Sequence, residues 1–456
     1  MHPFQYHVFA CEQRKPEGVP SCTARGSSSL VDALRREVSA RNLVDRVAVT
    51  PCGSLGLCES GPNLVVYPEG VWYSRVSSGD VVEIVTEHFQ NGRPVERLMR
   101  KDGAQLKAEI SEGRGRMLAA LASRDAAGVV PDELLESIRG FMSSRVLLTA
   151  IELDVFTALA RVPGPATAAI VTRALGTDRR ATETLLNALA ALGVVAKKDG
   201  AYSNGPVAAR FLVAGTPDDA RISLRHNASL WASWSALTDV VRSGKCAVRE
   251  EMCDRPDSWT TPFIAAMHRN AALRAPAVVK AVGAQGVRRV LDIGGGSGAY
   301  SIAFAKAHPG LEAEVFDLAS VVGIAERHIA EAGLDGRIHT RVGDLRHDSF
   351  GSGYDLALLS AICHMLGPEE NSDLFRRVFS ALSPGGRIVV QDHLMSDDKT
   401  SPRSGALFAV NMLVGTPHGG TYTSAEYGRW LREAGFSLIE TVPLQSPSGL
   451  VIGSRP

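Results

Sequence analysis

The sequence predicts a multidomain α/β protein, and three observations carry this prediction. Residues 290–304 (VLDIGGGSGAYSIAF) form an apolar strand pattern that ends in an acidic residue, then a glycine-rich turn and a helix pattern. From Thr261 onward, strand-like and helix-like segments alternate, as a parallel doubly wound sheet requires. The 456 residues exceed what one hydrophobic core usually serves, so we expect two to four domains.

Composition excludes several classes of protein. The chain is 45% hydrophobic with a formal net charge of +0, so no basic excess attracts nucleic acid or a membrane surface. No apolar run approaches the roughly 18 residues that span a bilayer, and the N-terminus lacks the pattern of a signal peptide. We expect a cytoplasmic protein without nucleic-acid or membrane partners. In that compartment its seven cysteines do not suggest a disulfide framework.

The first hundred residues form a compact α/β pattern. The sequence predicts strands at 6–10, 45–51 and 63–74 (the last a strand pair turned at 68–70), and helices at 27–43 and 80–92.

Four cysteines lie in the same stretch with the spacing C-x10-C-x29-C-x5-C: Cys11, Cys22, Cys52 and Cys58. Thiolates on two loops of a small cytosolic domain suit zinc or an iron–sulfur cluster. The paired C-x2-C knuckles typical of structural zinc are absent. The alternative is a set of unligated thiols.

Residues 6–98 resemble the thioredoxin-like [2Fe–2S] ferredoxins. The resemblance rests on HVFACEQRKPEGVPSC, TPCGSLGLCESGPNLVVYPEGVWY and GRPVERL. It implies a ferredoxin-like domain at 1–100, a [2Fe–2S] cluster and a redox partner for this domain.

The ligand set departs from that family at one position. Cys11, Cys22 and Cys58 match three ligands, whereas the fourth falls on Ser54, with Cys52 two residues earlier. We expect Cys52 to replace the missing ligand from the same loop. The alternatives are ligation by Ser54 as an alkoxide, or loss of the cluster with retention of the fold.

A helical linker and a helical domain follow. Residues 101–132 are charged and rich in alanine, which predicts a helical connector. The domain at 133–260 opens with apolar residues at helical spacing, and residues 166–212 give helix, turn, helix and a hairpin, the pattern of a winged helix. Because this stretch lacks the basic face that DNA affinity needs, we expect dimerisation and a lid over the active site rather than DNA binding.

The glycine turn alone is ambiguous. Gly294, Gly296 and Gly298 let a ligand approach bare backbone beside a helix N-terminus. Gly294, Gly296 and Ala299 also fit the dinucleotide pattern. Asp317 ends the second strand, where a carboxylate can accept both ribose hydroxyls, a feature shared with NAD sites. Asp344 ends the third strand, where it can lie beside an adenine amino group, and the sheet closes with LSPGGRIVV and two further strand-like segments. Together these three features favour a nucleotide–methionine ligand.

The alternating pattern at 261–456 resembles the Rossmann-like domain of class I S-adenosylmethionine (SAM) methyltransferases. Residues 133–456 further resemble the small-molecule O-methyltransferases of the caffeate and hydroxyneurosporene type. That resemblance includes FIAAMHRNAALRAPAVVKAV and NMLVGTPHGGTYTSAEYGRWLREAGF. It implies a winged-helix dimerisation domain, a homodimer, SAM as cofactor and a small-molecule methyl acceptor.

The resemblance also implies the site residues. The cofactor set comprises Asp292, Gly294, Gly296, Gly298, Asp317, Leu318, Gly343, Asp344, Leu345 and Ser360. Met267 matches a family position that lines the methyl pocket, the alternative being an ordinary core methionine. Beyond the resemblance, the candidate residues of the acceptor pocket are His268, Trp231, Trp234, Asn411 and Met412.

His364, in AICHMLGPEE, occupies the position of the family's general base. A neutral imidazole can take a phenol or enol proton as the oxygen attacks the methyl group. The family's usual Asp-Trp after this histidine is Met365-Leu366 here, and Asp392 or His393 could orient the imidazole.

The sequence therefore predicts methylation of a hydroxyl on an aromatic or polyketide-like metabolite. The alternatives are methylation of sulfur or nitrogen, a SAM-binding redox enzyme that transfers no methyl group, and a winged-helix transcription factor.

Overall fold

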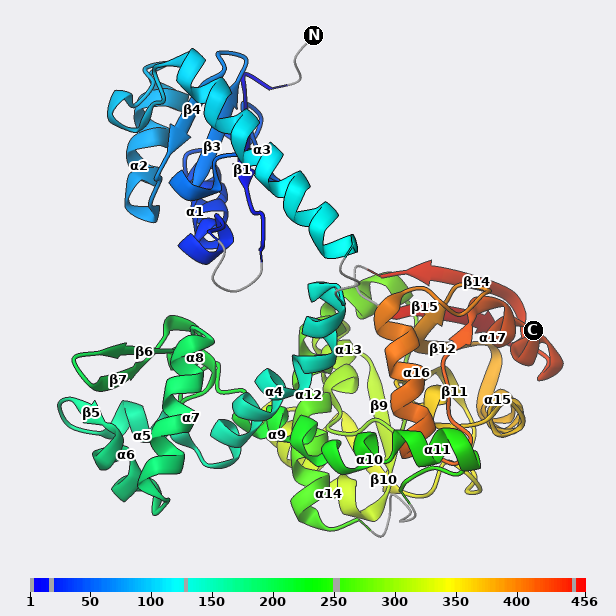
Figure 1. Cartoon of the computed structure of the whole chain (residues 1–456). Helices are drawn as coiled ribbons and strands as arrows, with labels where there is room; N and C mark the ends of the chain where they lie inside the picture. Colours follow the sequence, from blue (N-terminus) through cyan, green and yellow to red (C-terminus); the bar gives the residue numbers. More distant parts are fainter. Residues whose placement is uncertain (1–3, 16–19, 127–129, 249–254, 445–447) are drawn as a thin grey trace. The chain divides into compact units, whose positions relative to one another are not determined.

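The computed structural model describes residues 4–15, 20–126, 130–248, 255–444 and 448–456 (Figure 1). The chain forms two compact units, an N-terminal unit (Met1–Gly140) and a C-terminal unit (Phe141–Pro456). No helix in the described part of the chain combines the length and the apolar character that crossing a bilayer requires.

The N-terminal unit is built on a four-stranded sheet in the order β2-β1-β3-β4. Its strands are β1 (Tyr6–Cys11), β2 (Val47–Cys52), β3 (Asn63–Tyr67) and β4 (Val71–Ser74). β1 runs parallel to β2, to which α1 (Ser27–Ala40) connects it, and antiparallel to β3, which forms a hairpin with β4. Alternate residues of β1, Tyr6, Val8 and Ala10, face the same core as the apolar side of α1.

Two further helical segments complete this unit. Val81–Glu83 (α2) continues without a break into a wider helical segment, Ile84–Gln90, so the predicted helix at 80–92 is confirmed. α3 (Gly103–Ala126) forms the predicted helix of the connector. It packs against the loop between β2 and β3: a Cβ added at Gly113 would lie 2.3 Å from the carbonyl oxygen of Gly56. Backbone therefore meets backbone at this contact.

α4 (Asp132–Glu152) runs across the boundary between the units, and the C-terminal unit continues with the predicted helix, turn, helix and hairpin. These elements are α5 (Val155–Arg161), β5 (Ala166–Thr167), α6 (Ala168–Leu175), α7 (Arg179–Ala191), β6 (Val195–Lys198), β7 (Ala201–Asn204) and α8 (Pro206–Phe211). Asp178 begins α7, because its carboxylate accepts a hydrogen bond from the backbone N of Ala181 at 2.8 Å. The three short strands pair in the order β5-β7-β6.

In the described residues, the helices between this part and the large sheet are α9 (Arg221–Ser229), α10 (Trp231–Ser235), α11 (Leu237–Ser243) and α12 (Asp257–Val282). The large sheet has the order β10-β9-β8-β11-β12-β15-β14. Its strands are β8 (Arg289–Ile293), β9 (Glu312–Asp317), β10 (Ile338–Val342), β11 (Tyr354–Ser360), β12 (Leu382–Met395), β14 (Ser437–Pro443) and β15 (Ser448–Ser454), and β13 (Tyr422–Thr423) pairs with β12.

The first five strands are parallel, so the predicted doubly wound sheet is confirmed; β15 is antiparallel to both of its neighbours. The crossing helices are α13 (Ala299–Ala307), α14 (Ala319–Glu331), α15 (Pro368–Ala381), α16 (Arg403–Gly415) and α17 (Ser424–Glu433). One hydrophobic core joins the sheet to α15 and α17, and the other joins it to α12, α13 and α14.

The order of the strands reverses between β8 and β11, which are neighbours in the sheet but not in sequence. In open α/β sheets, ligands bind beyond the carboxyl ends of the strands at such a reversal. The fold therefore places a ligand site where the glycine turn follows β8.

We expect Gly343→Ala to destabilise the C-terminal unit. A Cβ at this position would lie 2.3 Å from Cζ of the buried Phe316 ring, which has no flexible end to move aside. Overpacking of this kind costs about 1–3 kcal/mol. Chemical denaturation should show this loss, whereas Gly336→Ala should change little, because a Cβ there meets no described atom within 4 Å. Equal stability of the two variants would contradict this view of the packing.

Candidate functional site

The glycine turn between β8 and α13 presents bare backbone at the end of the sheet. Gly294, Gly296 and Gly298 have φ values of +65°, +59° and +73°, in the left-handed region that favours glycine. A Cβ at Gly294 would lie 2.3 Å from Cδ1 of Ile362, whereas at Gly296 it would meet no described atom within 4 Å. A side chain at Gly294 is disfavoured by the backbone conformation and would displace Ile362, whereas Gly296 leaves room for a ligand.

Asp292, the last polar residue of β8, lacks one partner. Oγ of Ser301 donates to its Oδ2 at 2.7 Å, whereas its buried Oδ1 accepts no hydrogen bond from the described residues. Burial raises the pKa of Asp292 to about 6, and the nearby charge of Asp317 adds to this effect. A buried carboxylate oxygen without a donor is costly. The site is therefore suited to a ligand that brings a hydrogen-bond donor or a positive charge.

Asp317, at the end of β9, is held by backbone on both oxygens. The N–H of Gly296 donates to Oδ2 at 2.7 Å, and the N–H of Leu318 donates to Oδ1 at 2.8 Å. Burial raises its pKa to about 6. Each carboxylate oxygen can accept a further hydrogen bond. Asp317 is therefore oriented by the glycine turn to accept two hydroxyl groups.

The end of β10 adds the third acidic residue. The backbone N–H of Gly343 donates to the carbonyl of Asp317 at 2.9 Å, which joins this loop to β9. Asp344 accepts from the backbone N of Arg346 at 2.9 Å and lies 2.7 Å from its guanidinium, and hydrogen bonding to Arg346 lowers the pKa of Asp344. The side chain of Leu345 lies beside Gly294. The predicted cofactor residues from β8, β9 and β10 are thus brought to one edge.

Ser360 ends β11, the next strand across the reversal. Its Oγ donates to Oε1 of Gln391 on β12 at 3.0 Å. The hydroxyl therefore has a structural partner in the neighbouring strand.

His364 lies in a 3₁₀ turn (Cys363–Met365) just beyond β11 and forms a buried pair with Asp392 of β12. Its Nδ1 is 2.8 Å from Oδ1 of Asp392, and its backbone N–H donates to Oδ2 at 3.0 Å. Burial raises the pKa of Asp392, but the charge and hydrogen bonds of His364 outweigh burial, so the pKa lies below its usual value. The ionised carboxylate makes Nδ1 the donor and leaves Nε2 to accept a proton. Of the two candidates to orient His364, the structure pairs Asp392 with it.

The turn that carries His364 is fixed by residues that sequence reasoning missed. The buried Asn371 donates through Nδ2 to the carbonyls of Cys363 and Leu366, at 2.9 and 3.2 Å. The hydroxyl of Tyr422 also donates to the carbonyl of Leu366. No motif marks these contacts. Asn371 reaches back to the turn from the start of α15, whereas Tyr422 reaches it from β13, which is distant in sequence.

α16 lines the site beside His364. Phe408, also missed by sequence reasoning, packs edge-on against His364 with ring centroids 4.8 Å apart, and it contacts His393 as well. Asn411 on the same helix accepts a hydrogen bond from Nε1 of Trp234 at 2.8 Å, which ties α10 to α16. Met412, one residue further along, is buried.

The other predicted acceptor residues lie in different surroundings. The ring of Trp231 lies 5.5 Å from the guanidinium of Arg145. Met267 is half-buried on α12. Nδ1 of His268 is 2.8 Å from Oγ of Ser297, and its ring stacks on His328 at 4.1 Å. His268 and His328 both line a groove of about 870 Å³ between α12, α13 and α14. Among the described residues, no hydrogen bond or ring contact joins these three predicted residues to His364.

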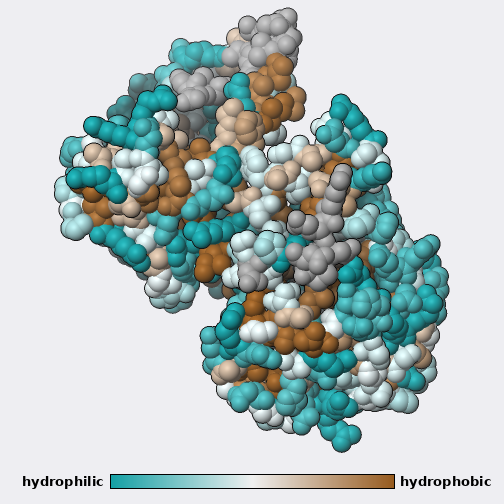
Figure 2. Space-filling model, turned by 90° about the horizontal axis from the view of Figure 1, so that it is seen from below, coloured by the Kyte–Doolittle hydropathy of each residue, from teal (hydrophilic) through white to brown (hydrophobic). Residues whose placement is uncertain are grey.

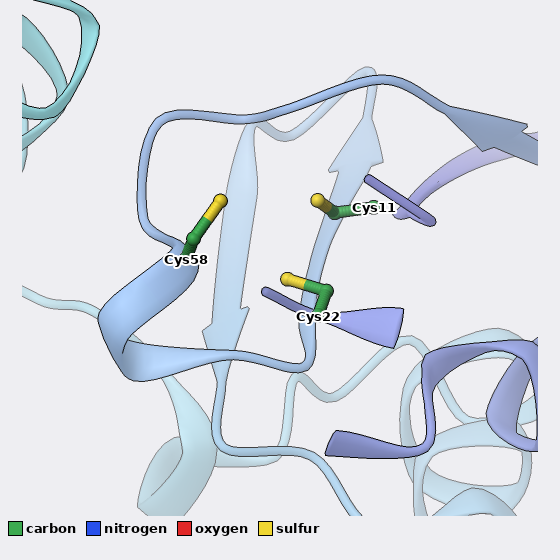
Figure 3. A group of neighbouring side chains, drawn as sticks. All are labelled: Cys11, Cys22 and Cys58. Carbon is green, nitrogen blue, oxygen red and sulfur yellow. The ribbon is translucent and has the colours of Figure 1, made fainter. Parts of the chain in front are cut away.

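In the N-terminal unit, Cys11, Cys22 and Cys58 are brought together. Their sulfur atoms all lie within 4.8 Å of one another, the three residues are buried, and Figure 3 shows the side chains turned into one space. Hydrogen bonds from Cys11 and Cys22 lower the pKa of Cys58, whereas those with Cys11 and Cys58 raise the pKa of Cys22. Three buried soft donors fit a zinc ion or an iron–sulfur cluster.

The predicted fourth ligand, Cys52, does not join that group. It pairs with Cys11 in the parallel ladder of β1 and β2 and is half-exposed, and burial raises the pKa of its thiol to about 11. Oγ of Ser54 instead lies 3.3 Å from Sγ of Cys58.

Comparison with known proteins identifies the family to which this chain belongs. The sequence model of an O-methyltransferase domain matches residues 234–437, and that of an O-methyltransferase dimerisation domain matches residues 135–214. A 3-hydroxy-5-methyl-1-naphthoate 3-O-methyltransferase of Streptomyces sahachiroi is 37% identical over 336 residues, which are 71% of this chain and 95% of that protein.

A second curated relative and a solved structure support the same family. The tetracenomycin polyketide synthesis 8-O-methyl transferase TcmO of Streptomyces glaucescens is 30% identical over 337 residues, covering 72% of this chain and 97% of that protein. The structure of human N-acetylserotonin methyltransferase in complex with SAM superimposes with a TM-score of 0.64 at 26% identity, over 71% of this chain and 97% of that one. The chain belongs to the family of SAM-dependent O-methyltransferases.

Proposed function

We propose that this O-methyltransferase methylates a hydroxyl group of a small aromatic or polyketide-like metabolite, with His364 as the general base. The observation that carries the proposal is the buried pair of His364 and Asp392, which leaves Nε2 free to accept a proton. Ile362, two residues before the base, packs on Gly294. The base and the glycine turn therefore border one site.

SAM supplies a methyl group on a positively charged sulfur. The residues at the edge of the sheet are suited to hold it. The unpartnered Oδ1 of Asp292 can accept from the ammonium of the methionine half, and Asp317 can accept from the two ribose hydroxyls. Gly343, Asp344 and Leu345 then border the adenine. All of these assignments are supported by the common position of the residues, which lie at or just beyond the carboxyl ends of β8, β9 and β10.

Nε2 of His364 would take the proton that the acceptor oxygen gives up on receiving the methyl group that bound SAM supplies. Asp392 stabilises the imidazolium that forms, because its carboxylate is ionised and hydrogen-bonded to Nδ1. Phe408 and Met412 provide apolar surface near the reacting groups, which helps to exclude water.

Two observations support this class of acceptor: the names of the relatives, and the side chains on and beside α16. The two curated relatives act on a naphthoate and in tetracenomycin polyketide synthesis. In this chain, Phe408, Trp234 and Met412 contribute rings and apolar surface on and beside α16. Aromatic acceptors would pack on such side chains.

We infer that the chain forms a homodimer through its helical domain. The dimerisation-domain match begins within α4. On that helix Leu134, Ile138, Phe141 and Met142 are each more than half exposed, at a spacing that puts them on one face. Figure 2 shows hydrophobic patches on the surface of the molecule, separated by hydrophilic residues. An exposed apolar stripe of this kind is typical of an interface between chains.

We also infer that the N-terminal unit is a thioredoxin-like, ferredoxin-like domain that holds a [2Fe–2S] cluster and serves a redox partner. The inference is supported by the sheet order β2-β1-β3-β4 and by the three buried cysteines at its end. Cys11, Cys22 and Cys58 would supply thiolate ligands.

Asp292→Asn should stabilise the ligand-free protein at neutral pH while weakening SAM binding. Because folding raises the pKa of Asp292 from 3.8 to about 6, its contribution to stability is complete below pH ~4 and is lost as the pH rises through 6. Removing the charge should restore up to about 3 kcal/mol at pH 8 and roughly half of that at pH 5. Thermal melts at both pH values and calorimetric titration with SAM test this. A fall in melting temperature that is equal at both pH values would contradict it.

His364→Ala should lower kcat by roughly 10²–10⁴-fold without changing the Kd for SAM, since the imidazole takes the acceptor proton. The residual rate should rise with pH as the acceptor hydroxyl ionises by itself. Asp392→Asn should also lower kcat, because the amide no longer stabilises the imidazolium. The control is His339→Ala, on the exposed surface of β10.

A modest loss in His364→Ala, with an unchanged pH profile, would count against O-methylation. A thiol acceptor ionises largely without help, so that result would favour methylation at sulfur.

Phe141→Glu and Ile138→Glu should convert a dimer into monomers, because each buries a charge in the proposed interface. Light scattering coupled to size-exclusion chromatography measures the mass. Leu118→Glu, an equally exposed apolar position on α3, is the matched control and should leave the mass unchanged. A monomeric parent protein, or variants that remain dimeric, would refute the interface.

A further inference from the structure

We propose that the fourth protein ligand of the metal centre is the side-chain oxygen of Ser54 and not the thiolate of Cys52. The inference rests on the proposed [2Fe–2S] cluster of the N-terminal unit. It assigns Cys11 and Cys22 to one iron, and Cys58 and Ser54 to the other.

The distances support this pairing. Cys11, Cys22 and Cys58 form one group of sulfur atoms (Figure 3), and the hydroxyl of Ser54 lies 3.3 Å from the sulfur of Cys58. Two ligands of one tetrahedral ion, a sulfur and an oxygen, lie about 3.5 Å apart when their bonds to the metal have ordinary lengths. Ser54 and Cys58 are therefore spaced like two ligands of one ion before any metal is bound.

The sulfur of Cys52 lies outside this group, although the backbone of Cys52 is next to that of Cys11. Cys52 is the last residue of β2 and pairs in register with Cys11, and its carbonyl accepts a hydrogen bond from the backbone N of Glu12 at 2.9 Å. These backbone bonds fix its Cα. Its sulfur does not lie within the 4.8 Å that joins the other three. Ligation by Cys52 would therefore need its side chain to turn toward the other three sulfur atoms.

Hydrogen bonding also holds the side chain of Ser54 in a position suited to metal ligation. The backbone N–H of Gly56 donates to its Oγ at 3.1 Å, which would stabilise the oxygen after it has released its proton to solvent on metal binding. The same loop is buttressed by α3, since a Cβ at Gly56 would lie 3.0 Å from Cγ2 of Ile110. The loop therefore needs little rearrangement to present Ser54.

An oxygen ligand gives the centre a distinct chemistry. An alkoxide is a harder donor than a thiolate and favours the more oxidised iron. Cluster potential follows ligand type and hydrogen bonding. A cluster with Ser54 should therefore have a lower midpoint potential, and absorption at shorter wavelength, than the same cluster with four cysteines.

The experiment compares four full-length proteins after anaerobic reconstitution with iron and sulfide: the parent chain, Cys52→Ala, Ser54→Ala and Ser54→Cys. Iron and sulfide content, visible absorption, electron paramagnetic resonance of the reduced form and midpoint potential are measured on each. We expect two irons and two sulfides per chain in the parent and in Cys52→Ala, with identical spectra. Ser54→Ala should lose most of the iron. Ser54→Cys should keep it, with a shift to longer wavelength and a higher potential.

Other outcomes would overturn the assignment. Loss of iron in Cys52→Ala, with Ser54→Ala unchanged, would make Cys52 the ligand. If only Ser54→Cys binds iron, the fold accepts a cluster but Ser54 does not ligate it. Iron in neither the parent nor Ser54→Cys would refute the cluster itself. Because Ser54→Cys restores a full set of thiolates, it distinguishes these failures even if Ser54→Ala does not fold.

Discussion

The catalytic half depends on one buried carboxylate, that of Asp392. It accepts hydrogen bonds from the imidazole of His364 and from the backbone N–H groups of His364 and His393. A buried charge with these partners stays ionised, whereas without them it would be neutral. The same interaction therefore selects the tautomer of His364 and ties the turn after β11 to β12. Asn371 and Tyr422 then hold the far end of that turn.

The sequence was most informative where local pattern and chemistry coincide. Glycine spacing and the acidic strand ends predicted the arrangement around Asp292 and Asp317, because a parallel sheet brings these positions together. Phe408 and Asn371 could not be predicted in this way, because the packing of whole helices decides their contacts. The domain limits at 100, 132 and 260 stay predictions.

Cys52 illustrates the same limit in the N-terminal unit. Counting cysteines favoured it as a ligand, since a thiolate is a better donor than a hydroxyl. Its place in the ladder of β1 and β2 depends on strand register, which the sequence does not reveal. Ser54, a weaker donor by chemistry, has the better position. At the proposed metal centre, Cys52 thus has the stronger donor atom but the less favourable position, and Ser54 has the weaker donor atom but the more favourable position.

The contact between Gly56 and Gly113 has a consequence for how such a chain can vary. A glycine within a helix costs about 1 kcal/mol relative to alanine, and Gly113 lies near the middle of α3. Its lack of a side chain is what lets the helix rest on the carbonyl of Gly56. An insertion or deletion within α3 before Gly113 would turn the helix and bring a side chain to the contact. The connector can thus change in length only beyond Gly113, and the segment before it belongs to the fold of the N-terminal unit.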